Sequence, residues 1–139
     1  MTQQSQFTLP VRVYYEDTDA GGVVYYANYL RYFERCRSEW VRSFGIDQRQ
    51  LAETHDLVFV VRRASIEYLR PARLDDLLTI GLTVEHAGRA QITVAQCALR
   101  EPEGTLLASA TVQLAAISAS AFKPKSLPGW LRQQLESRT

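Results

Sequence analysis

Residues 15–29 decide what this sequence predicts, and they are Tyr15-Glu16-Asp17-Thr18-Asp19-Ala20-Gly21-Gly22-Val23-Val24-Tyr25-Tyr26-Ala27-Asn28-Tyr29. The stretch places three carboxylates and a Gly-Gly pair between an apolar strand pattern and the start of a long amphipathic helix. Carboxylates act as acids, bases or nucleophiles, and adjacent glycines let the backbone pass close to another molecule. A helix start adds unpaired N–H groups that stabilise a developing negative charge. Together these features indicate a catalytic loop that attacks a carbonyl group.

The segment after this loop, residues 27–44, has the spacing of an amphipathic helix. Arg35 and Glu39 are spaced for an i,i+4 ion pair on its polar face. Asn28 is a candidate N-cap, and Gly45 is a candidate C-terminal stop. The apolar residues recur at steps of three and four, so they share one face; they are Tyr29, Phe33, Cys36, Trp40 and Phe44, with Leu30 and Val41 widening the stripe.

Five segments have the composition or the alternation of β-strands, and they are residues 7–16, 57–69, 77–85, 90–99 and 106–117. Residues 101–104, Glu-Pro-Glu-Gly, form a turn signal between the last two of these segments. Asp47 can cap a short helical turn over residues 48–53, and residues 127–135 predict a brief helix.

The order of these elements is strand, long helix and then four strands. A helix with one apolar stripe must bury it against another element, and an antiparallel sheet is the available surface. We therefore predict an α+β fold, with a curved antiparallel sheet wrapped around one long central helix. We expect one domain over residues 1–139, in which the last three strands form a meander.

The composition is ordinary for a soluble globular protein, with 46% hydrophobic residues and a formal net charge of +1. This charge argues against binding nucleic acid through bulk electrostatics. Residues 1–8 are polar and lack the apolar run of a signal peptide, and no segment has the ~20 apolar residues of a transmembrane helix. We therefore expect a cytoplasmic protein without a membrane span.

Cysteine and histidine residues do not indicate a disulfide or a metal site. Cys36 lies on the apolar side of the predicted helix and Cys97 lies within a strand pattern, so both are expected to be structural. His55 and His86 have no neighbouring ligands at a useful spacing. We predict no metal and no other cofactor.

The loop and the helix start together resemble the hotdog-fold acyl-CoA thioesterases. The resemblance rests on residues 14–25 with Ala27-Asn28-Tyr29, on Phe33-Glu34-Arg35 and Glu39-Trp40, and on residues 68–72, Tyr-Leu-Arg-Pro-Ala. The sequence is most similar to the 4-hydroxybenzoyl-CoA thioesterase family and its YbgC-type branch, which is associated with the Tol–Pal system. The resemblance implies a hotdog fold and hydrolysis of an acyl-CoA to a carboxylic acid and free CoA. It also implies a homo-oligomer, either a dimer whose sheets join edge to edge or a homotetramer of two such dimers.

One position departs from the YbgC-type pattern. Many YbgC-type sequences have a histidine where this chain has Tyr26, whereas the 4-hydroxybenzoyl-CoA enzymes have a tyrosine there. A mechanism that needs an imidazole from this position therefore does not apply to this chain. A mechanism that uses only the main-chain N–H of Tyr26 is compatible with the sequence.

The resemblance also implies roles for individual residues. Asp19 matches the family's catalytic aspartate and is expected to act as nucleophile or general base, although an aspartate before two glycines also commonly accepts hydrogen bonds from turn amides. The N–H of Tyr26 is expected to polarise the thioester carbonyl, assisted by the helix dipole. Arg89 is expected to contact the CoA phosphates, with Arg62, Arg63 and Lys123 as weaker candidates. The acyl site is expected to be lined by Gly22, Val24, Tyr25 and Tyr29.

Other carboxylates and other functions stay open at this point. Glu16 and Asp17 are expected to be structural, and Glu34 to pair with Arg37 or Arg31, although a related hotdog branch has its catalytic glutamate on this helix. One alternative function is a hotdog hydratase, but these enzymes usually need a histidine and the loop has none. Another is a non-catalytic interaction module associated with Tol–Pal that binds an acyl carrier protein.

Overall fold

The computed structural model describes residues 5–136 of the chain. The polar segment 1–8, from which we predict no signal peptide, lies partly outside these residues. Five antiparallel strands form one sheet in the order β1-β3-β4-β5-β2, and they are β1 (Phe7–Arg12), β2 (Leu57–Tyr68), β3 (Leu77–Ala87), β4 (Gln91–Glu101) and β5 (Thr105–Ser118). The predicted meander is confirmed, because β3, β4 and β5 are neighbours in both sequence and sheet.

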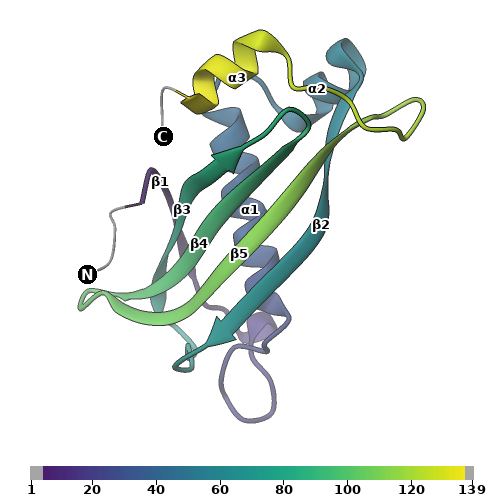
Figure 1. The fold of residues 1–139 in the computed structure, drawn as a ribbon. Coiled ribbons are helices and arrows are strands. Elements are labelled where there is room, and N and C mark those ends of the chain that lie inside the picture. The colour runs from purple at the N-terminus through teal and green to yellow at the C-terminus, as the bar shows by residue number, and fades with distance from the viewer. Residues whose placement is uncertain (1–4, 137–139) are drawn as a thin grey trace.

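The long helix α1 (Asn28–Arg42) lies across one face of the sheet, as Figure 1 shows. Two shorter helices, α2 (Gln48–His55) and α3 (Gly129–Glu136), lie near one end of the sheet (Figure 1). The loop between η1 (Tyr15–Asp17) and α1 lies at the opposite end. The curved sheet wrapped around α1 confirms the predicted α+β hotdog fold. Within residues 5–136, no helix combines the length and the apolar character needed to cross a bilayer.

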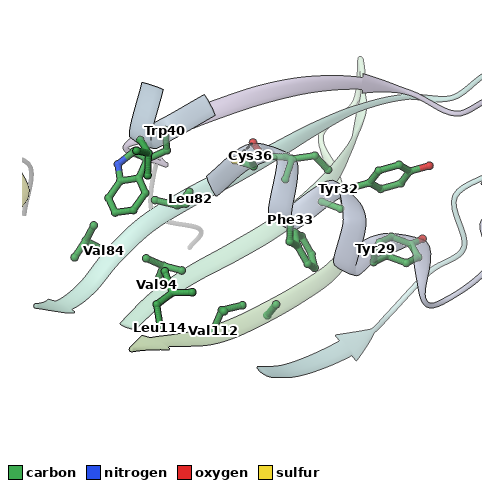
Figure 2. Close-up of a cluster of buried hydrophobic side chains, with 14 of the residues drawn as sticks. Tyr29, Tyr32, Phe33, Cys36, Trp40, Leu82, Val84, Val94, Val112 and Leu114 are labelled. Carbon is green, nitrogen blue, oxygen red and sulfur yellow. Dashed lines mark hydrogen bonds between the residues drawn. The ribbon is translucent and has the colours of Figure 1, made fainter. Parts of the chain in front are cut away.

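The apolar stripe of α1 packs against the inward side chains of β3, β4 and β5 (Figure 2). Phe33 and Cys36 have no exposed surface, and they face strand residues such as Leu82, Val94 and Val112. Tyr32 is also fully buried, although the sequence pattern does not single it out. Leu30 is 46% exposed, so the prediction that it widens the stripe is wrong. The stripe is therefore rotated toward Tyr32 and away from Leu30.

The first strand ends earlier than the predicted limit of residue 16. β1 stops at Arg12, and residues 15–17 form one turn of 3-10 helix instead. The reason is local: the N–H of Tyr14 donates to the Asp17 carboxylate at 2.8 Å, and the N–H of Asp17 donates to the Tyr14 carbonyl at 3.0 Å. An aspartate that bonds a nearby main-chain amide competes with strand pairing in this way.

The predicted ion pairs on α1 are also corrected. Glu39 pairs with Arg42, three residues later, rather than with Arg35. Glu34 accepts a hydrogen bond from the Ser38 hydroxyl at 2.7 Å, and within residues 5–136 it forms no ion pair with Arg31 or Arg37. Helical spacings of three and four residues are both within reach of these side chains, so the sequence alone does not decide between them.

The two short helices follow the predicted signals. Asp47 caps α2, since its carboxylate accepts from the N–H of Gln50 at 2.8 Å while the Gln50 side chain accepts from the N–H of Asp47 at 3.1 Å. This is a capping box, and it starts the helix where the sequence predicts. The helix continues two residues beyond the predicted limit and ends at His55, and the φ of 51° at the C-cap residue Asp56 lies in the left-handed region.

Candidate active site

The predicted catalytic loop is a tight hairpin. Thr18 and Val24 form an antiparallel bridge, and the N–H of Asp19 donates to the Val23 carbonyl at 2.9 Å. The N–H of Gly22 donates back to the Asp19 carbonyl at 3.0 Å. Gly22 has a φ of 78°, which is a left-handed conformation that a residue with a β-carbon adopts only with strain. The Gly-Gly pair therefore lets the chain reverse immediately after Asp19.

One of the two oxygens of the Asp19 carboxylate is hydrogen-bonded within its own turn. Its Oδ1 atom accepts a hydrogen bond from the N–H of Gly21 at 2.9 Å, which confirms the turn-amide interaction that the sequence left open. Within the described residues, no protein donor bonds the second oxygen, Oδ2, and the side chain is exposed. One oxygen thus fixes the orientation of the carboxylate while the other remains available.

The hairpin rests on the connection between β2 and β3. The N–H of Val24 donates to the Ala72 carbonyl at 2.8 Å, and Val23 bridges to Arg73. The N–H of Ala72 in turn donates to the Tyr29 hydroxyl at 3.3 Å. Val24 and Tyr29 are 5% and 3% exposed, so in this single chain both are packing residues. Burial is the main cause that raises the pKa of Tyr29.

The start of α1 differs from the predicted cap. Ala27, not Asn28, is the N-cap residue, and it has no side-chain cap. Asn28 lies inside the helix, and its Nδ2 atom donates to the Asp17 carbonyl at 2.8 Å. The prediction of Asn28 as the N-cap is therefore wrong, because its side chain reaches back to the loop rather than to the helix amides.

The main-chain N–H of Tyr26 lies at this uncapped helix start. Within residues 5–136 it donates to no protein acceptor, as is common for the first amides of a helix. The carbonyl of the same residue is held on both sides: it accepts from the N–H of Tyr29 at 3.4 Å and from the Tyr68 hydroxyl at 3.1 Å. The Tyr26 N–H is therefore available as a donor, while hydrogen bonds to the Tyr26 carbonyl hold the residue in place.

Tyrosine rings cluster beside this donor. The ring of Tyr26 lies 4.9 Å from that of Tyr25 and 6.1 Å from that of Tyr68, between ring centroids, and Tyr68 lies 5.4 Å from Tyr29. The Tyr26 side chain is 62% exposed, so it does not belong to the core. Contact with the Tyr26 hydroxyl raises the pKa of Tyr25, and the negative charge of Asp19 adds to this shift. Asp19 and Tyr25 therefore share one electrostatic environment.

Tyr68 is the residue of this site that the sequence analysis missed. It is the last residue of β2, and alternation within a strand gives no indication of a contact with a loop more than forty residues earlier. The signal that existed is its place at the start of the segment 68–72, which contributes to the family resemblance. The contact appears only when the end of β2 meets the start of α1.

Arg89 is not brought to this loop. It lies in the turn between β3 and β4, at the end of the sheet near α3 and opposite to the loop (Figure 1). Its Nε atom donates to the Ser126 hydroxyl at 3.0 Å, and its side chain is exposed. In a single chain the loop thus gathers Asp19, Gly22, Val24, Tyr25, Tyr26 and Tyr29 but not Arg89.

Cys36 is a structural residue rather than a reactive one. Cys36 is fully buried, its thiol donates to the Ile80 carbonyl at 3.6 Å, and burial raises its pKa to about 12. A thiol with such a pKa is not a nucleophile at neutral pH. In the described part of the chain, no cluster of His, Cys, Asp or Glu side chains is arranged to hold a metal ion.

Two cavities lie away from the loop. The larger, of about 600 Å³, is a hollow on the sheet face opposite α1, lined by small side chains such as Thr79, Cys97 and Ser109. The smaller, of about 140 Å³, lies between α1 and β2. Neither is lined by Asp19 or Tyr26. In the single chain, Asp19, Ala20 and Gly21 are exposed to solvent.

Known proteins are similar to this chain in both sequence and fold. The Thioesterase superfamily profile matches residues 21–107. The chain is 44% identical over 122 residues to the acyl-CoA thioesterase YbgC of Haemophilus influenzae, and the aligned region covers 88% of each chain. It is 34% identical over 110 residues to the long-chain acyl-CoA thioesterase FadM of Escherichia coli, which covers 79% of this chain and 82% of FadM.

A solved structure gives the same result. The crystal structure of a probable thioesterase from Bartonella henselae superposes with a TM-score of 0.81 at 40% identity, covering 87% of this chain and 98% of that one. Sequence similarity and the same overall fold are thus found together in one solved protein. This chain belongs to the thioesterase superfamily and is an acyl-CoA thioester hydrolase with the hotdog fold.

Proposed function

We propose that Asp19 and the N–H of Tyr26 carry out the hydrolysis of an acyl-CoA to a carboxylic acid and free CoA. The observation that carries this proposal is that one short segment holds both a carboxylate oxygen and a helix-start main-chain N–H that have no protein partner within residues 5–136. A thioester carbonyl is electrophilic and its thiolate leaves readily, so hydrolysis needs little beyond a nucleophile and stabilisation of the oxyanion.

In one route, Asp19 is the nucleophile. Its free oxygen attacks the thioester carbon, and the carbonyl electrons move to the oxygen. When the carbonyl re-forms, the C–S bond breaks and CoA leaves as a thiolate that takes up a proton. Water then hydrolyses the mixed anhydride, which releases the carboxylic acid and regenerates Asp19. A mass increase on Asp19 in enzyme quenched during turnover is the expected sign of this route.

In the other route, Asp19 is a general base. It removes a proton from a water molecule as the water oxygen attacks the thioester carbon, and the departing thiolate receives a proton as the C–S bond breaks. No covalent adduct forms on the enzyme in this route. The hydrogen bond from Gly21 to Oδ1 fits both routes, because it orients the carboxylate and leaves Oδ2 available.

The Tyr26 N–H is proposed to stabilise the oxyanion that both routes share. The first amides of α1 have no side-chain cap, and the helix dipole places partial positive charge at this end. Loss of one such donor typically costs about 3–4 kcal/mol of transition-state stabilisation. Asn28 and Tyr68 hold the segments on either side of this amide.

The acyl group is proposed to lie against Gly22, Val24, Tyr25 and Tyr29. Tyr25 and Tyr26 present exposed rings beside Asp19, whereas Val24 and Tyr29 support them from within the core. Tyrosines at the mouth of the site suit either an aromatic acyl group or a short aliphatic one. Because the relative FadM is named a long-chain acyl-CoA thioesterase, a long aliphatic acyl group is a further candidate substrate.

The open side of the loop supports a proposed dimer. β2 is a 12-residue edge strand that, within residues 5–136, pairs with β5 alone, and its residues 61–65 are exposed. A long unpaired edge is a template for another strand. Antiparallel pairing of two β2 strands places the Tyr68 end of one copy beside the Leu57 end of the other, so the second copy covers the open side of the loop.

Larger assembly and location are further parts of the proposal. The hollow on the outer sheet face offers a second surface through which two dimers can form the homotetramer. Arg89 reaches the CoA phosphates only if a second copy brings it there, since within one chain it lies at the opposite end of the sheet. A cytoplasmic location fits the supply of acyl-CoA substrates.

A panel of acyl-CoA thioesters tests the proposed function. Short aliphatic, long aliphatic and aromatic acyl-CoAs are incubated with the protein, and free thiol is measured with a chromogenic reagent. Thiol release from at least one class is expected, while hydration of an enoyl-CoA in parallel is not. Hydration without thiol release favours the hydratase. Tight binding of an acyl carrier protein without cleavage of any thioester favours the interaction module.

A further inference from the structure

Asn28 is one of two buried polar residues in the described chain, the other being Gln96. Asn28 is 8% exposed, and its Nδ2 atom donates to the Asp17 carbonyl at 2.8 Å. A buried amide is costly unless it is hydrogen-bonded, so its position at the start of α1 needs a reason. The helix itself does not supply one, because Ala27 occupies the N-cap position and no amide at the helix start uses the Asn28 side chain.

The Asp17 carbonyl joins the two halves of the proposed site. Besides the Asn28 side chain, it accepts the N–H of Tyr25 at 2.9 Å. Asp17 lies two residues before Asp19, and Tyr25 lies directly before Tyr26. One carbonyl oxygen therefore connects the 3-10 turn that precedes the carboxylate with the segment that leads to the proposed oxyanion donor.

Besides this carbonyl, the hairpin is held by its own hydrogen bonds and by its contacts with Ala72 and Arg73. The bond from Asp19 to Val23 and the bond from Gly22 to Asp19 both lie within the hairpin and do not reach the helix. The tip of the hairpin is exposed on Asp19, Ala20 and Gly21. Its orientation relative to α1 is therefore set at its base, where the Asn28 side chain contacts it directly and Tyr29 of the same helix contacts it through Ala72.

Tyr68 holds the helix start from the other side. Its hydroxyl donates to the Tyr26 carbonyl at 3.1 Å, and its ring lies in edge contact with the rings of Tyr26 and Tyr29. This contact joins the end of β2 to the segment 26–29. The Tyr26 peptide is thus anchored to the sheet through Tyr68, while Asn28 anchors the hairpin to the same turn of the helix.

We infer that Asn28 and Tyr68 are positioning residues that fix the separation between the Asp19 carboxylate and the Tyr26 N–H. The inference rests on the proposed function, because it assigns those two groups to the reaction. A misplacement of about 1 Å at a catalytic group can lower the rate about 100-fold, whereas binding is less sensitive to it. The Asp17 carbonyl keeps the Tyr25 N–H when Asn28 is removed, so the fold retains a partner there.

The test compares Asn28→Ala with Gln96→Ala. Gln96 is 3% exposed, and its Nε2 atom donates to the Phe33 carbonyl at 3.0 Å, so both substitutions remove a buried amide that bonds a main-chain carbonyl. The Gln96 contact lies in the core, away from the loop. Asn28→Ala is expected to lower kcat by about 30- to 100-fold with KM changed less than about threefold. Gln96→Ala is expected to lower Tm as much or more while kcat stays within about threefold of wild type.

A second pair keeps the test decisive if Asn28→Ala does not fold. Tyr68→Phe removes only the hydroxyl that bonds Tyr26, and Tyr15→Phe removes the hydroxyl of an 80% exposed tyrosine nearby. Tyr68→Phe is expected to lower kcat by about three- to tenfold with little change in KM, because its bond is partly exposed to competing water. Tyr15→Phe is expected to leave kcat unchanged.

The outcomes separate this inference from the proposed function. If Asn28→Ala and Tyr68→Phe keep the wild-type kcat while Asp19→Asn is inactive, the inference is overturned and the proposed function stands. Equal losses of kcat in Asn28→Ala and Gln96→Ala also overturn it, because they indicate general loss of structure. If Asp19→Asn itself keeps its activity, the proposed function fails first.

Discussion

In the proposed mechanism, Asp19 combines a structural and a chemical task. Its Oδ1 atom stabilises the turn by accepting the Gly21 N–H, and its Oδ2 atom is left for chemistry. A carboxylate held in this way loses little freedom when substrate binds, which favours reaction over alternative orientations. The turn that orients Asp19 in turn depends on the conformation of Gly22.

We predict that Gly22→Ala impairs activity more than stability. The φ of 78° at Gly22 is strained for alanine, although a β-carbon there meets no atom within 4 Å, so the loop is expected to shift rather than unfold. The shift moves Asp19, and kcat is expected to fall at least about tenfold. Steady-state kinetics and thermal unfolding measure both effects.

Gly104→Ala is the matched control for this prediction. Gly104 has a φ of 74° in the turn between β4 and β5, and a β-carbon there also meets no atom within 4 Å. It is expected to lose about 1 kcal/mol of stability, like Gly22→Ala, and to keep its activity. Equal activity in the two variants would show that the conformation of Gly22 does not matter for the site.

Among the secondary-structure elements, the end of α2 has a pH-dependent contribution to stability. The Ser118 hydroxyl, and then the Ser120 hydroxyl and N–H, donate to the Asp56 carboxylate and lower its pKa. The positive charge of Lys125 adds a smaller effect in the same direction. Because the pKa of Asp56 is lower in the folded state, its contribution is complete above the unfolded pKa of about 3.9 and is lost as pH falls through the folded value.

Asp56→Asn is therefore expected to lower the free energy of unfolding at about pH 6, and the difference from wild type is expected to narrow as pH falls below about 4. Asparagine tolerates the left-handed φ of this position, so the backbone is not the cause of the loss. Urea unfolding at several pH values measures the difference. A difference that stays constant down to the acid limit would show that the ionised Asp56 does not stabilise the fold.

The sequence predicts some secondary-structure elements better than others. The apolar spacing of Phe33, Cys36 and Trp40 was sufficient to place α1, because a helix of this length buries one face whatever its partner. The end of β1 was not predictable in this way, since the bond between Tyr14 and the Asp17 side chain competes with an equally apolar strand pattern. Local side-chain bonds of this kind decide element boundaries and leave little trace in the spacing.

At the scale of the whole molecule, prediction of the site was limited by contacts between distant segments. Asp19, Gly22 and Tyr26 lie within eight residues of one another, so the sequence alone brings them together. Tyr68 reaches the site only through the path of β2, and Arg89 is carried to the opposite end of the sheet. The family resemblance implies that Arg89 contacts the CoA phosphates. Within a single chain, Arg89 lies too far from the loop to do so.

The proposed dimer leads to a prediction about β2. Val61 is 49% exposed on this edge strand, and Val61→Glu is expected to separate the subunits because a charged residue on an edge opposes pairing. The variant is expected to elute as a monomer with light-scattering detection and to lose at least about tenfold in kcat/KM, since the open side of the loop is no longer covered.

Thr8→Glu is the control for this prediction, because Thr8 is exposed on β1, the strand at the other edge of the sheet. It is expected to keep the β2-paired dimer and the activity of the wild type, whereas association of two dimers through the outer hollow, which Thr8 also lines, is expected to be weakened. A fully active monomeric Val61→Glu variant would contradict a site that two copies complete.

The most direct test of the account is the rate of thiol release by Asp19→Asn with the best acyl-CoA of the panel. Asparagine keeps the size of the side chain and an oxygen for the Gly21 N–H, so far-UV circular dichroism and Tm are expected to match the wild type. Nearly all turnover is expected to be lost, because asparagine is neither a nucleophile nor a base of useful strength. Retention of more than about a tenth of wild-type kcat by the folded variant would contradict a central role for Asp19.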